Sequence, residues 1–275
     1  MRVLLTNDDG IRAGGLQALR RALLEVPDVD LVTIAPDGNR SAIGRGITTR
    51  APLSVERVEF DDGTHGYQTD GTPVDCVRLM GLGLVEGWTA DIVVAGINHG
   101  ANLGDDVTYS GTVAAAMEGL MLGLPAVAVS QQFKRGDTTW ATGDEAFDFS
   151  HSARFTARLV EGIEDVPLPS GVLINVNVPG GGEPEGVEVC RLGKRIYRDE
   201  LKLDSDEGGV RRFWIYGAEP SFEDEPGTDL AAVHQGRVAV TPLHMDFTHH
   251  DGIGPLSEAE LHDLLAPAVR EFEGG

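Results

Sequence analysis

Carboxylate, hydroxyl and amide side chains follow three short apolar segments of the sequence. Asp8 and Asp9 come one residue after RVLLT, Ser41 follows DLVTIAP, and Asn98 follows DIVVAG. Each segment is rich in Val, Ile and Leu and does not alternate with polar residues, which is typical of a strand buried on both faces of a parallel sheet. Ligands of such sheets bind outside the carboxyl ends of the strands, so we expect these side chains to form one polar site.

Oxygen ligands of this kind favour Mg²⁺, Mn²⁺ or Ca²⁺ over zinc. Asp8 and Asp9 would repel each other and shift each other's pKa unless a cation lay between them. Ser41 and Asn98 would add neutral oxygens, which leaves room at a divalent cation for water and an anionic substrate. The alternative for the two aspartates is a turn followed by a helix cap, because Asp is a good N-cap residue and Asp-Gly is a common turn.

A second motif, Ser110-Gly111-Thr112, opens an expected helix over residues 113–123. Backbone N–H groups at a small, glycine-containing helix start can bind phosphate, and Asn98 could contact the same phosphate. The alternative is an ordinary Ser or Thr N-cap. The motif lacks the lysine of a nucleotide P-loop, so no Walker-type site is predicted.

Other polar residues lie beside these motifs. Asn39 and Asn102 are candidates for contacts with substrate. Asp105 or Asp106 could orient ligands or accept a proton, and the alternative is that they brace the loop. No Gly-x-Ser-x-Gly nucleophile elbow and no glycine-rich dinucleotide fingerprint occurs in the sequence.

Strands and helices are expected to alternate over residues 1–180, which predicts a Rossmann-like, doubly wound α/β core with a mostly parallel sheet. The expected strands cover residues 2–6, 30–35, 52–59, 65–69, 91–95, 124–130 and 172–179. The expected helices cover residues 16–25, 113–123 and 144–163, with one more that opens at Gly71-Thr72-Pro73, where proline suits the first turn.

The character of the chain changes after residue 180. Residues 181–250 read as a β-rich extension, an inserted arm or an oligomerisation element, with strands at 187–190, 211–216 and 237–241. Two acidic stretches, 199–209 and 219–228, are expected to be loose. The remaining residues, 251–275, are expected to contain a helix at about 257–272.

The composition excludes several classes of protein. The chain has 275 residues and a formal charge of −22, from 44 acidic and 22 basic side chains. Such a surface repels nucleic acids and anionic lipids, and it stays hydrated at high salt, which predicts a salt-loving source.

The sequence contains no run of about 18 apolar residues, so no membrane span is predicted. Two distant cysteines, Cys76 and Cys190, predict buried thiols and a cytoplasmic location, and the N-terminal strand leaves no room for a signal peptide.

Several segments resemble one known family, the SurE survival-protein nucleotidases, in the same order along the chain. They are LLTNDDG (4–10), APDGNRS (35–41), GTPVDCV (71–77), the stretch from AGIN to AMEG (95–119), NVNVP (175–179), TDLAAV (228–233) and VTPL (240–243). The resemblance implies a metal-dependent phosphomonoesterase that hydrolyses nucleoside 5′-monophosphates. Nucleoside 3′-monophosphates would be a further class of substrate.

The resemblance also implies roles for individual residues. Asp8, Asp9, Ser41 and Asn98 would hold one Mg²⁺ or Mn²⁺ per subunit, and Asp8 or Asp9 would act as general base. Ser110, Gly111 and Thr112 would bind phosphate, together with Asn98. The β-rich arm would exchange between the subunits of a homodimer or homotetramer.

The chain departs from the family pattern after Ser41. Members often carry a Ser-Gly-x-Ser-Asn-Ser run there, whereas this sequence reads Ser41-Ala42-Ile43-Gly44-Arg45-Gly46. Arg45 stands where an asparagine could contact substrate and is a candidate for a phosphate contact of its own. Other activities remain open: a short-chain polyphosphatase, a non-catalytic nucleotide or metal sensor, or a scaffold protein that uses the arm.

Overall fold

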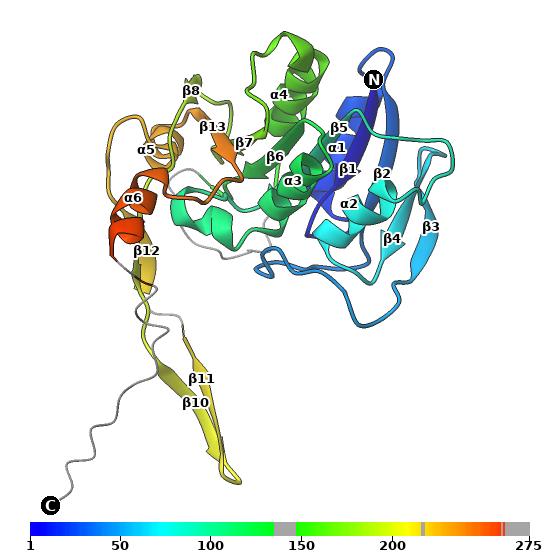
Figure 1. Cartoon of the computed structure of the whole chain (residues 1–275). Coiled ribbons are helices and arrows are strands. Elements are labelled where there is room, and N and C mark those ends of the chain that lie inside the picture. Colours follow the sequence, from blue (N-terminus) through cyan, green and yellow to red (C-terminus); the bar gives the residue numbers. More distant parts are fainter. Residues whose placement is uncertain (135–146, 216–217, 260, 262–275) are drawn as a thin grey trace, which may run out of the picture. The chain divides into compact units, whose positions relative to one another are not determined.

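The computed structural model describes residues 1–134, 147–215, 218–259 and 261 (Figure 1). The chain divides into two compact units, Met1–His244 and Met245–Gly275. The first unit contains the central sheet and every expected site residue. In the second unit, helix α6 covers His250–Glu258, so the expected start at residue 257 is wrong, and most of 257–272 lies outside the described residues.

A nine-stranded sheet forms the centre of the first unit, in the order β3-β4-β2-β1-β5-β6-β7-β13-β8. Strands β2, β1, β5, β6 and β7 run parallel to their neighbours within that group. β3 and β13 run antiparallel to β4 and β7, respectively. The strands are β1 (Arg2–Thr6), β2 (Asp30–Pro36), β3 (Val55–Glu59), β4 (His65–Thr69), β5 (Ile92–His99), β6 (Ala126–Gln131), β7 (Val172–Val178), β8 (Val187–Val189) and β13 (Val238–His244).

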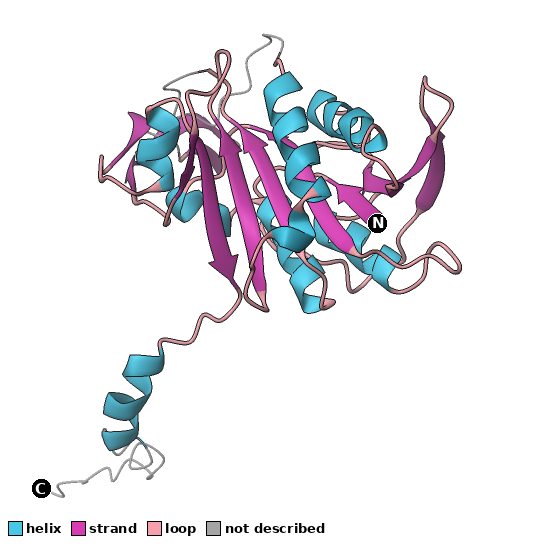
Figure 2. Ribbon diagram, turned by 90° about the horizontal axis from the view of Figure 1, so that it is seen from above, coloured by secondary structure: helices cyan, strands magenta, loops and turns pink. Residues whose placement is uncertain are grey.

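Helices cover both faces of this sheet (Figure 2). α1 packs against α4, and α2 packs against α3, on the other face. These helices are α1 (Gly14–Leu24), α2 (Pro73–Gly81), α3 (Gly111–Met121) and α4 (Ser150–Glu161), and a shorter α5 covers Asp229–His234. The expected doubly wound α/β fold is therefore confirmed.

The apolar strands lie in the core between these helix layers. Val3, Leu4 and Leu5 of β1 are at most 1% exposed, and all residues of β6 are buried. Cys76 and Cys190 are free and buried, as expected. No helix within the described residues is both long and apolar enough to cross a membrane.

Helix α4 starts later than the expected residue 144. Its first residue is Ser150, whose N–H donates a hydrogen bond to the carboxylate of Asp148 at 2.9 Å. Phe147 and Phe149 stack on each other before the helix begins. Residues 144–146 lie outside the described residues.

An arm, defined here as residues 195–222, extends from the first unit (Figure 1). It contains β9 (Arg195–Arg198), β10 (Lys202–Glu207), β11 (Val210–Trp214) and β12 (Ala218–Phe222). β9 pairs with β12, and β10 pairs with β11, both antiparallel. The strands β8 and β13, from the expected β-rich extension, lie instead in the central sheet.

The expectation of a loose acidic stretch is wrong for residues 199–209, where β10 occupies Lys202–Glu207. In the stretch 219–228, β12 covers only the first residues, and residues 223–227 form no helix or strand. Acidic side chains in β10 have partners on β11: Asp204 accepts a hydrogen bond from the Trp214 indole, and Asp206 forms an ion pair with Arg211. These cross-strand contacts offset the poor strand propensity of aspartate, and composition alone does not reveal them.

Candidate active site

The expected site lies where the strand order reverses. From β1 the chain passes to β2 on one side and later to β5 on the other, so β1 and β5 flank a topological switch point. Such a switch leaves a crevice outside the carboxyl ends of the two strands. Asp8 follows β1, and Asn98 lies near the end of β5.

Asp8 lies in this crevice against the start of α3. Its side chain is only 3% exposed. A Cβ atom added to Gly111 would lie 2.8 Å from both Cβ and Oδ2 of Asp8, so only glycine allows α3 to approach this closely. The N-cap of α1 is Ala13, without a side-chain hydrogen bond, so neither aspartate caps that helix and the alternative role as a cap is wrong.

Asp9 is held by the end of β5. Its Oδ2 accepts a hydrogen bond from the backbone N–H of His99 at 3.0 Å. The imidazole Nε2 of His99 accepts a hydrogen bond from the N–H of Gly15, at the start of α1, at 3.3 Å. His99 thus connects the end of β5 with the carboxylate of Asp9 and with the start of α1.

Ser41 reaches the crevice from the loop after β2. The N–H of Arg40 donates a hydrogen bond to the carbonyl oxygen of Asp8 at 2.7 Å, which fastens this loop to the first one. The side-chain oxygen of Asn39 accepts a hydrogen bond from the N–H of Ser41 at 2.7 Å. Arg40 itself pairs with Asp37 through its guanidinium, as a structural cation.

Asn98 presents an oxygen to the same crevice. Its side-chain nitrogen donates a hydrogen bond to the carbonyl oxygen of Gly100 at 2.8 Å. The amide oxygen remains as the acceptor that a ligand can use. This orientation suits a neutral oxygen ligand for a hard cation.

A cavity of about 270 Å³, which we call the Asp8 cavity, joins most of the predicted site residues. Its walls include Asp8, Asn39, Ser41, Asn98, Asn102 and Ser110. Asp9, Gly111 and Thr112 adjoin it through their contacts with His99 and Asp8, but they do not line it.

The predicted phosphate-binding segment, residues 110–112, forms the start of α3. The hydroxyl of Ser110 caps α3 by accepting a hydrogen bond from the N–H of Val113 at 3.1 Å, so the N-cap alternative is correct for this side chain. The hydroxyl of Thr112 donates to the carboxylate of Asp8. A role of these residues towards phosphate stays a prediction, supported by the free amides that every helix start presents.

Arg45 does not line the Asp8 cavity. Its guanidinium pairs with Glu118 of α3 at 3.1 Å, and Arg78 of α2 pairs with the other oxygen of the same carboxylate at 3.1 Å. Glu118 is 2% exposed, so the two arginines neutralise a buried charge. In this structure Arg45 fastens the loop after Ser41 to α3, and its contact with substrate stays a prediction.

Asn102 is anchored from several sides. Its side-chain amide donates to the hydroxyl of Ser130 at 2.7 Å, and its backbone N–H donates to the side chain of Asn177 at 2.8 Å. The side-chain amides of Asn175 and Asn177 both donate to its carbonyl oxygen. The NVNVP motif of the sequence therefore positions the loop after Asn98, a role that the sequence did not reveal.

The electrostatics of the crevice favour a cation. Burial, and for Asp8 also the charge of Asp9, raises the pKa of both carboxylates well above the usual value. Within the described residues no arginine or lysine forms an ion pair with either of them. Two desolvated carboxylates without a basic partner are costly, and a bound divalent ion would offset that cost.

The donor set fits Mg²⁺ or Mn²⁺. No group of three or more His, Cys, Asp or Glu side chains forms a metal-binding cluster in the described parts of the chain. Two carboxylates with the neutral oxygens of Ser41 and Asn98 would make an all-oxygen site, which suits a hard cation that keeps some of its water.

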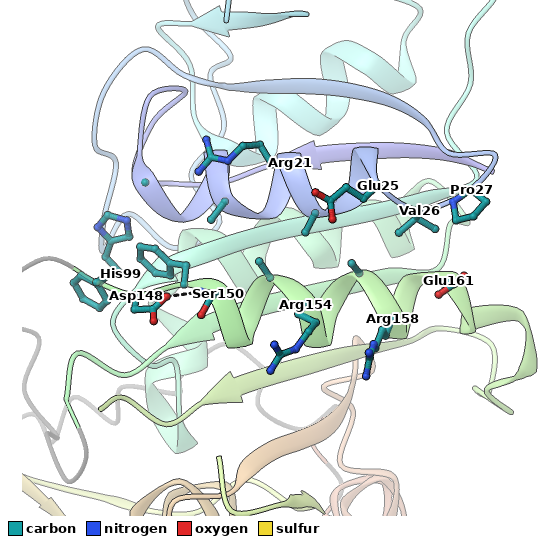
Figure 3. Close-up of a pocket in the computed structure, with 17 residues that line it drawn as sticks. Arg21, Glu25, Val26, Pro27, His99, Asp148, Ser150, Arg154, Arg158 and Glu161 are labelled. Carbon is teal, nitrogen blue, oxygen red and sulfur yellow. Dashed lines mark hydrogen bonds between the residues drawn. The ribbon is translucent and has the colours of Figure 1, made fainter. Parts of the chain in front are cut away.

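A second, larger cavity of about 1,080 Å³ lies between α1 and α4 (Figure 3). His99 lines both this cavity and the Asp8 cavity. Its ring stacks at 5.0 Å on Phe147 and on Phe149. Partial burial of His99 lowers the pKa of its imidazole.

Comparisons with known proteins show the family of the chain. A family model described as Survival protein SurE matches residues 3–199. The 5′-nucleotidase SurE of Rubrobacter xylanophilus is 51% identical over 269 residues, which cover 96% of this chain and 99% of the relative. The 5′-nucleotidase SurE of Gloeobacter violaceus is 42% identical over 271 residues, which cover 97% and 98%.

A solved structure shows the same architecture. The crystal structure of the SurE protein from Aquifex aeolicus matches with a TM-score of 0.78 and 37% identity, over 94% of this chain and 100% of that one. The resemblance predicted from the motifs is confirmed over most of the chain. This protein belongs to the SurE survival-protein family.

Proposed function

We propose that this protein is a metal-dependent nucleotidase that hydrolyses nucleoside 5′-monophosphates to a nucleoside and phosphate, with 3′-monophosphates as further substrates. The observation that carries the proposal is a pair of adjacent carboxylates at the switch point of the sheet, the buried Asp8 and the half-buried Asp9, whose pKa values are both raised. The 5′-nucleotidase names of relatives that match nearly the whole chain support the substrate class.

Asp8, Asp9, Ser41 and Asn98 would hold one Mg²⁺ or Mn²⁺. When bound, such an ion lowers the pKa of a water molecule and stabilises negative charge on a phosphate oxygen. The chain itself orients the phosphate, through Ser110 and the first amides of α3, and excludes bulk water from the buried carboxylates.

Asp9 is the better candidate for the general base. Asp8 is engaged by the hydroxyl of Thr112 and by the close approach of Gly111. Asp9 is held through the N–H of His99, at one of its two oxygens. In the reaction, Asp9 accepts a proton from the attacking water, and the water oxygen bonds to phosphorus as the bond between phosphorus and the ester oxygen breaks. The departing ester oxygen takes a proton from solvent water and leaves as an alcohol.

The test is phosphate release from a panel of 5′- and 3′-nucleoside monophosphates and short polyphosphates, with and without Mn²⁺ or Mg²⁺. Asp9→Asn should lower kcat by at least about 100-fold, the usual size of acid–base and electrostatic effects. Asp91→Asn is the matched control, because Asp91 pairs with Arg2 before the start of β5 and should leave kcat unchanged.

The outcomes separate the activities that remain open. Turnover close to wild type in Asp9→Asn would remove Asp9 from the mechanism. Release from polyphosphate alone would make the protein a polyphosphatase. No release from any ester with either metal, but metal binding at Asp8 and Asp9, would indicate a sensor.

We also propose that the arm joins subunits of a homodimer or homotetramer. The hairpin of β10 and β11 exposes large apolar side chains: Leu203, Val210, Phe213 and Trp214 are 38–58% exposed. An isolated two-stranded hairpin is at best marginally stable in water. A second copy of the chain that covers these side chains would stabilise it.

A requirement for high salt is a further part of the proposal. Acidic side chains outnumber basic ones by 44 to 22, and their repulsion is screened as ionic strength rises. The unfolding temperature should therefore rise as KCl is added. Full stability and activity in low-salt buffer without divalent metal would contradict a salt-loving source.

A further inference from the structure

Asp106 lines the Asp8 cavity, but residues of the arm occupy its carboxylate. Oδ2 accepts hydrogen bonds from Nε and Nη2 of Arg195, at 2.7 and 2.6 Å. Oδ1 accepts a hydrogen bond from the hydroxyl of Tyr197. Both partners lie on β9, the first strand of the arm. With both oxygens engaged, Asp106 is poorly placed to take a proton from substrate.

The ion pair between Asp106 and Arg195 is fully enclosed. Their side chains are 4% and 2% exposed. Removing two charges from water is costly, so a buried pair is weak support for stability, whereas the two contacts of the guanidinium with one carboxylate oxygen fix the relative position of two segments. The backbone N–H of Arg195 also donates to Oδ2 of Asp105 at 3.1 Å. Arg195 therefore holds two consecutive residues of one turn.

That turn, the 3₁₀ helix Gly104–Thr108, has a second anchor beside the arm. The N–H of Gly104 donates to Oδ2 of Asp229 at 2.8 Å, and Oδ1 of Asp229 accepts from the N–H of Gly193 at 2.7 Å. Gly104 has φ +53°, and a Cβ there would lie 2.7 Å from the carbonyl oxygen of Gly193. The turn thus packs directly on the segment that leads into β9.

The turn leads directly into the catalytic machinery. The carbonyl oxygen of Tyr109 accepts a hydrogen bond from the N–H of Gly44, in the loop after Ser41. The next residue, Ser110, caps α3, and Gly111 packs against Asp8. A shift of the turn would therefore move the start of α3 relative to the carboxylates.

We propose that Arg195, supported by Tyr197, is a positioning residue of the active site: it holds Asp106 and thereby sets the turn 104–108 and the start of α3 against Asp8. The base of the arm then completes the catalytic centre, besides any role in assembly. This inference rests on the proposed nucleotidase function for its kinetic readout. It needs no metal contact by Asp106 or Arg195.

The test uses Arg195→Gln, Arg195→Lys, Tyr197→Phe, Asp106→Asn and the double variant Asp106→Asn/Arg195→Gln in the full-length protein. The matched control is Arg191→Gln, which removes an exposed ion pair with Glu225 from the segment just before β9. For each variant, kcat and KM for a nucleoside 5′-monophosphate, the affinity for inorganic phosphate by calorimetry, the mass by light scattering and the far-ultraviolet circular dichroism are measured.

Arg195→Gln should lower kcat/KM by at least about tenfold, because small misplacements in an active site have effects of this size. It should weaken phosphate binding at unchanged mass and secondary structure. Arg195→Lys should restore part of the loss, Tyr197→Phe should show a smaller loss, and the control should resemble wild type. The double variant should lose no more than the worse single variant, because both changes break one contact.

Three results would overturn the inference. The first is that Arg195→Gln and Tyr197→Phe keep kcat/KM and phosphate affinity within about twofold of wild type. The second is that the two single losses multiply in the double variant, which indicates separate roles. The third is that activity falls only in proportion to a loss of mass or of folded protein; if Arg195→Gln does not fold, Tyr197→Phe decides. If wild type cleaves no nucleotide, the proposed function fails, and phosphate affinity alone decides this inference.

Discussion

The hydroxyl group of Thr112 donates a hydrogen bond to Oδ1 of Asp8 at 2.5 Å, across 104 residues of sequence. Asp8 follows the first strand, whereas Thr112 belongs to the first turn of α3. The hydrogen bond favours the charged form of Asp8 and so opposes the rise in its pKa that burial causes. It also fixes the orientation of the carboxylate relative to the start of α3.

Thr112→Val removes this hydrogen bond at nearly constant volume. The pKa of Asp8 should rise further, and affinity for Mn²⁺ near neutral pH should fall by about tenfold, the size of one hydrogen bond to a charged group. Isothermal titration with Mn²⁺ measures this change. Thr112→Ser keeps the hydroxyl and is the control. Equal affinities in the two variants would show that the hydroxyl does not orient Asp8.

Gly111→Ala should inactivate the protein without unfolding it. The added Cβ would lie 2.8 Å from Cβ and Oδ2 of Asp8, so the carboxylate or the start of α3 must move. We expect kcat to fall by at least about tenfold. Gly14→Ala is the control, because a Cβ there meets only a ring atom of Phe149, at 3.7 Å. Normal turnover in Gly111→Ala would show that Asp8 tolerates displacement.

The cation should stabilise the protein more at high pH than at low pH. Burial raises the pKa of Asp8 from 3.8 to about 7 and that of Asp9 from 3.8 to about 6. Between about pH 4 and 7 the folded, metal-free protein therefore binds more protons than the unfolded chain, and the contribution of these groups to stability falls as pH rises. Because Mn²⁺ competes with these protons, its binding strengthens over the same range.

Thermal unfolding with and without Mn²⁺, at about pH 5 and about pH 8, measures this linkage. The increase in Tm caused by Mn²⁺ should be larger at the higher pH. The double variant Asp8→Asn/Asp9→Asn should lose both the increase and its pH dependence. An increase in Tm that is equal at both pH values would place the cation elsewhere.

Charged residues introduced into the β10–β11 hairpin should dissociate the proposed homodimer or homotetramer. Leu203 of β10 lies opposite Phe213 of β11, and both are exposed in the single chain. Leu203→Asp/Phe213→Asp should reduce the molar mass in light scattering to that of one chain, since buried charges oppose association. Leu82→Asp, an exposed apolar position outside the arm, is the control. An unchanged mass would show that the hairpin does not join subunits.

Much of the core and its site could be predicted from local sequence. The strands that precede Asp8 and Ser41, and the strand that carries Asn98, are mostly apolar, and parallel strands must place their carboxyl ends at one edge of the sheet. That rule alone brings together residues that are 90 positions apart, as the hydrogen bond from the backbone N–H of His99 to the carboxylate of Asp9 shows. The capping box at the start of α2 joins Thr72 and Asp75, which are only three residues apart, so it can be recognised from local sequence.

The arm and its contacts could not be predicted in this way. β10 reads as an acidic loop, because the partners of Asp204 and Asp206 lie on the next strand. Arg195 is one of many arginines, and no local pattern selects Asp106 as its partner. Such pairings depend on tertiary packing, which overrides local propensity.

The order in which the chain is synthesised has a consequence for the turn at residues 104–108. Its two anchors lie far downstream: Arg195 is 89 residues after Asp106, and Asp229 is 125 residues after Gly104. A ribosome that has made the first strands and α3 has therefore exposed Asp8, Asn98 and Ser110 long before the turn between them has its partners. The nascent chain acquires its carboxylates early, and the turn at residues 104–108 gains its two anchors only after a further 89 to 125 residues have been made.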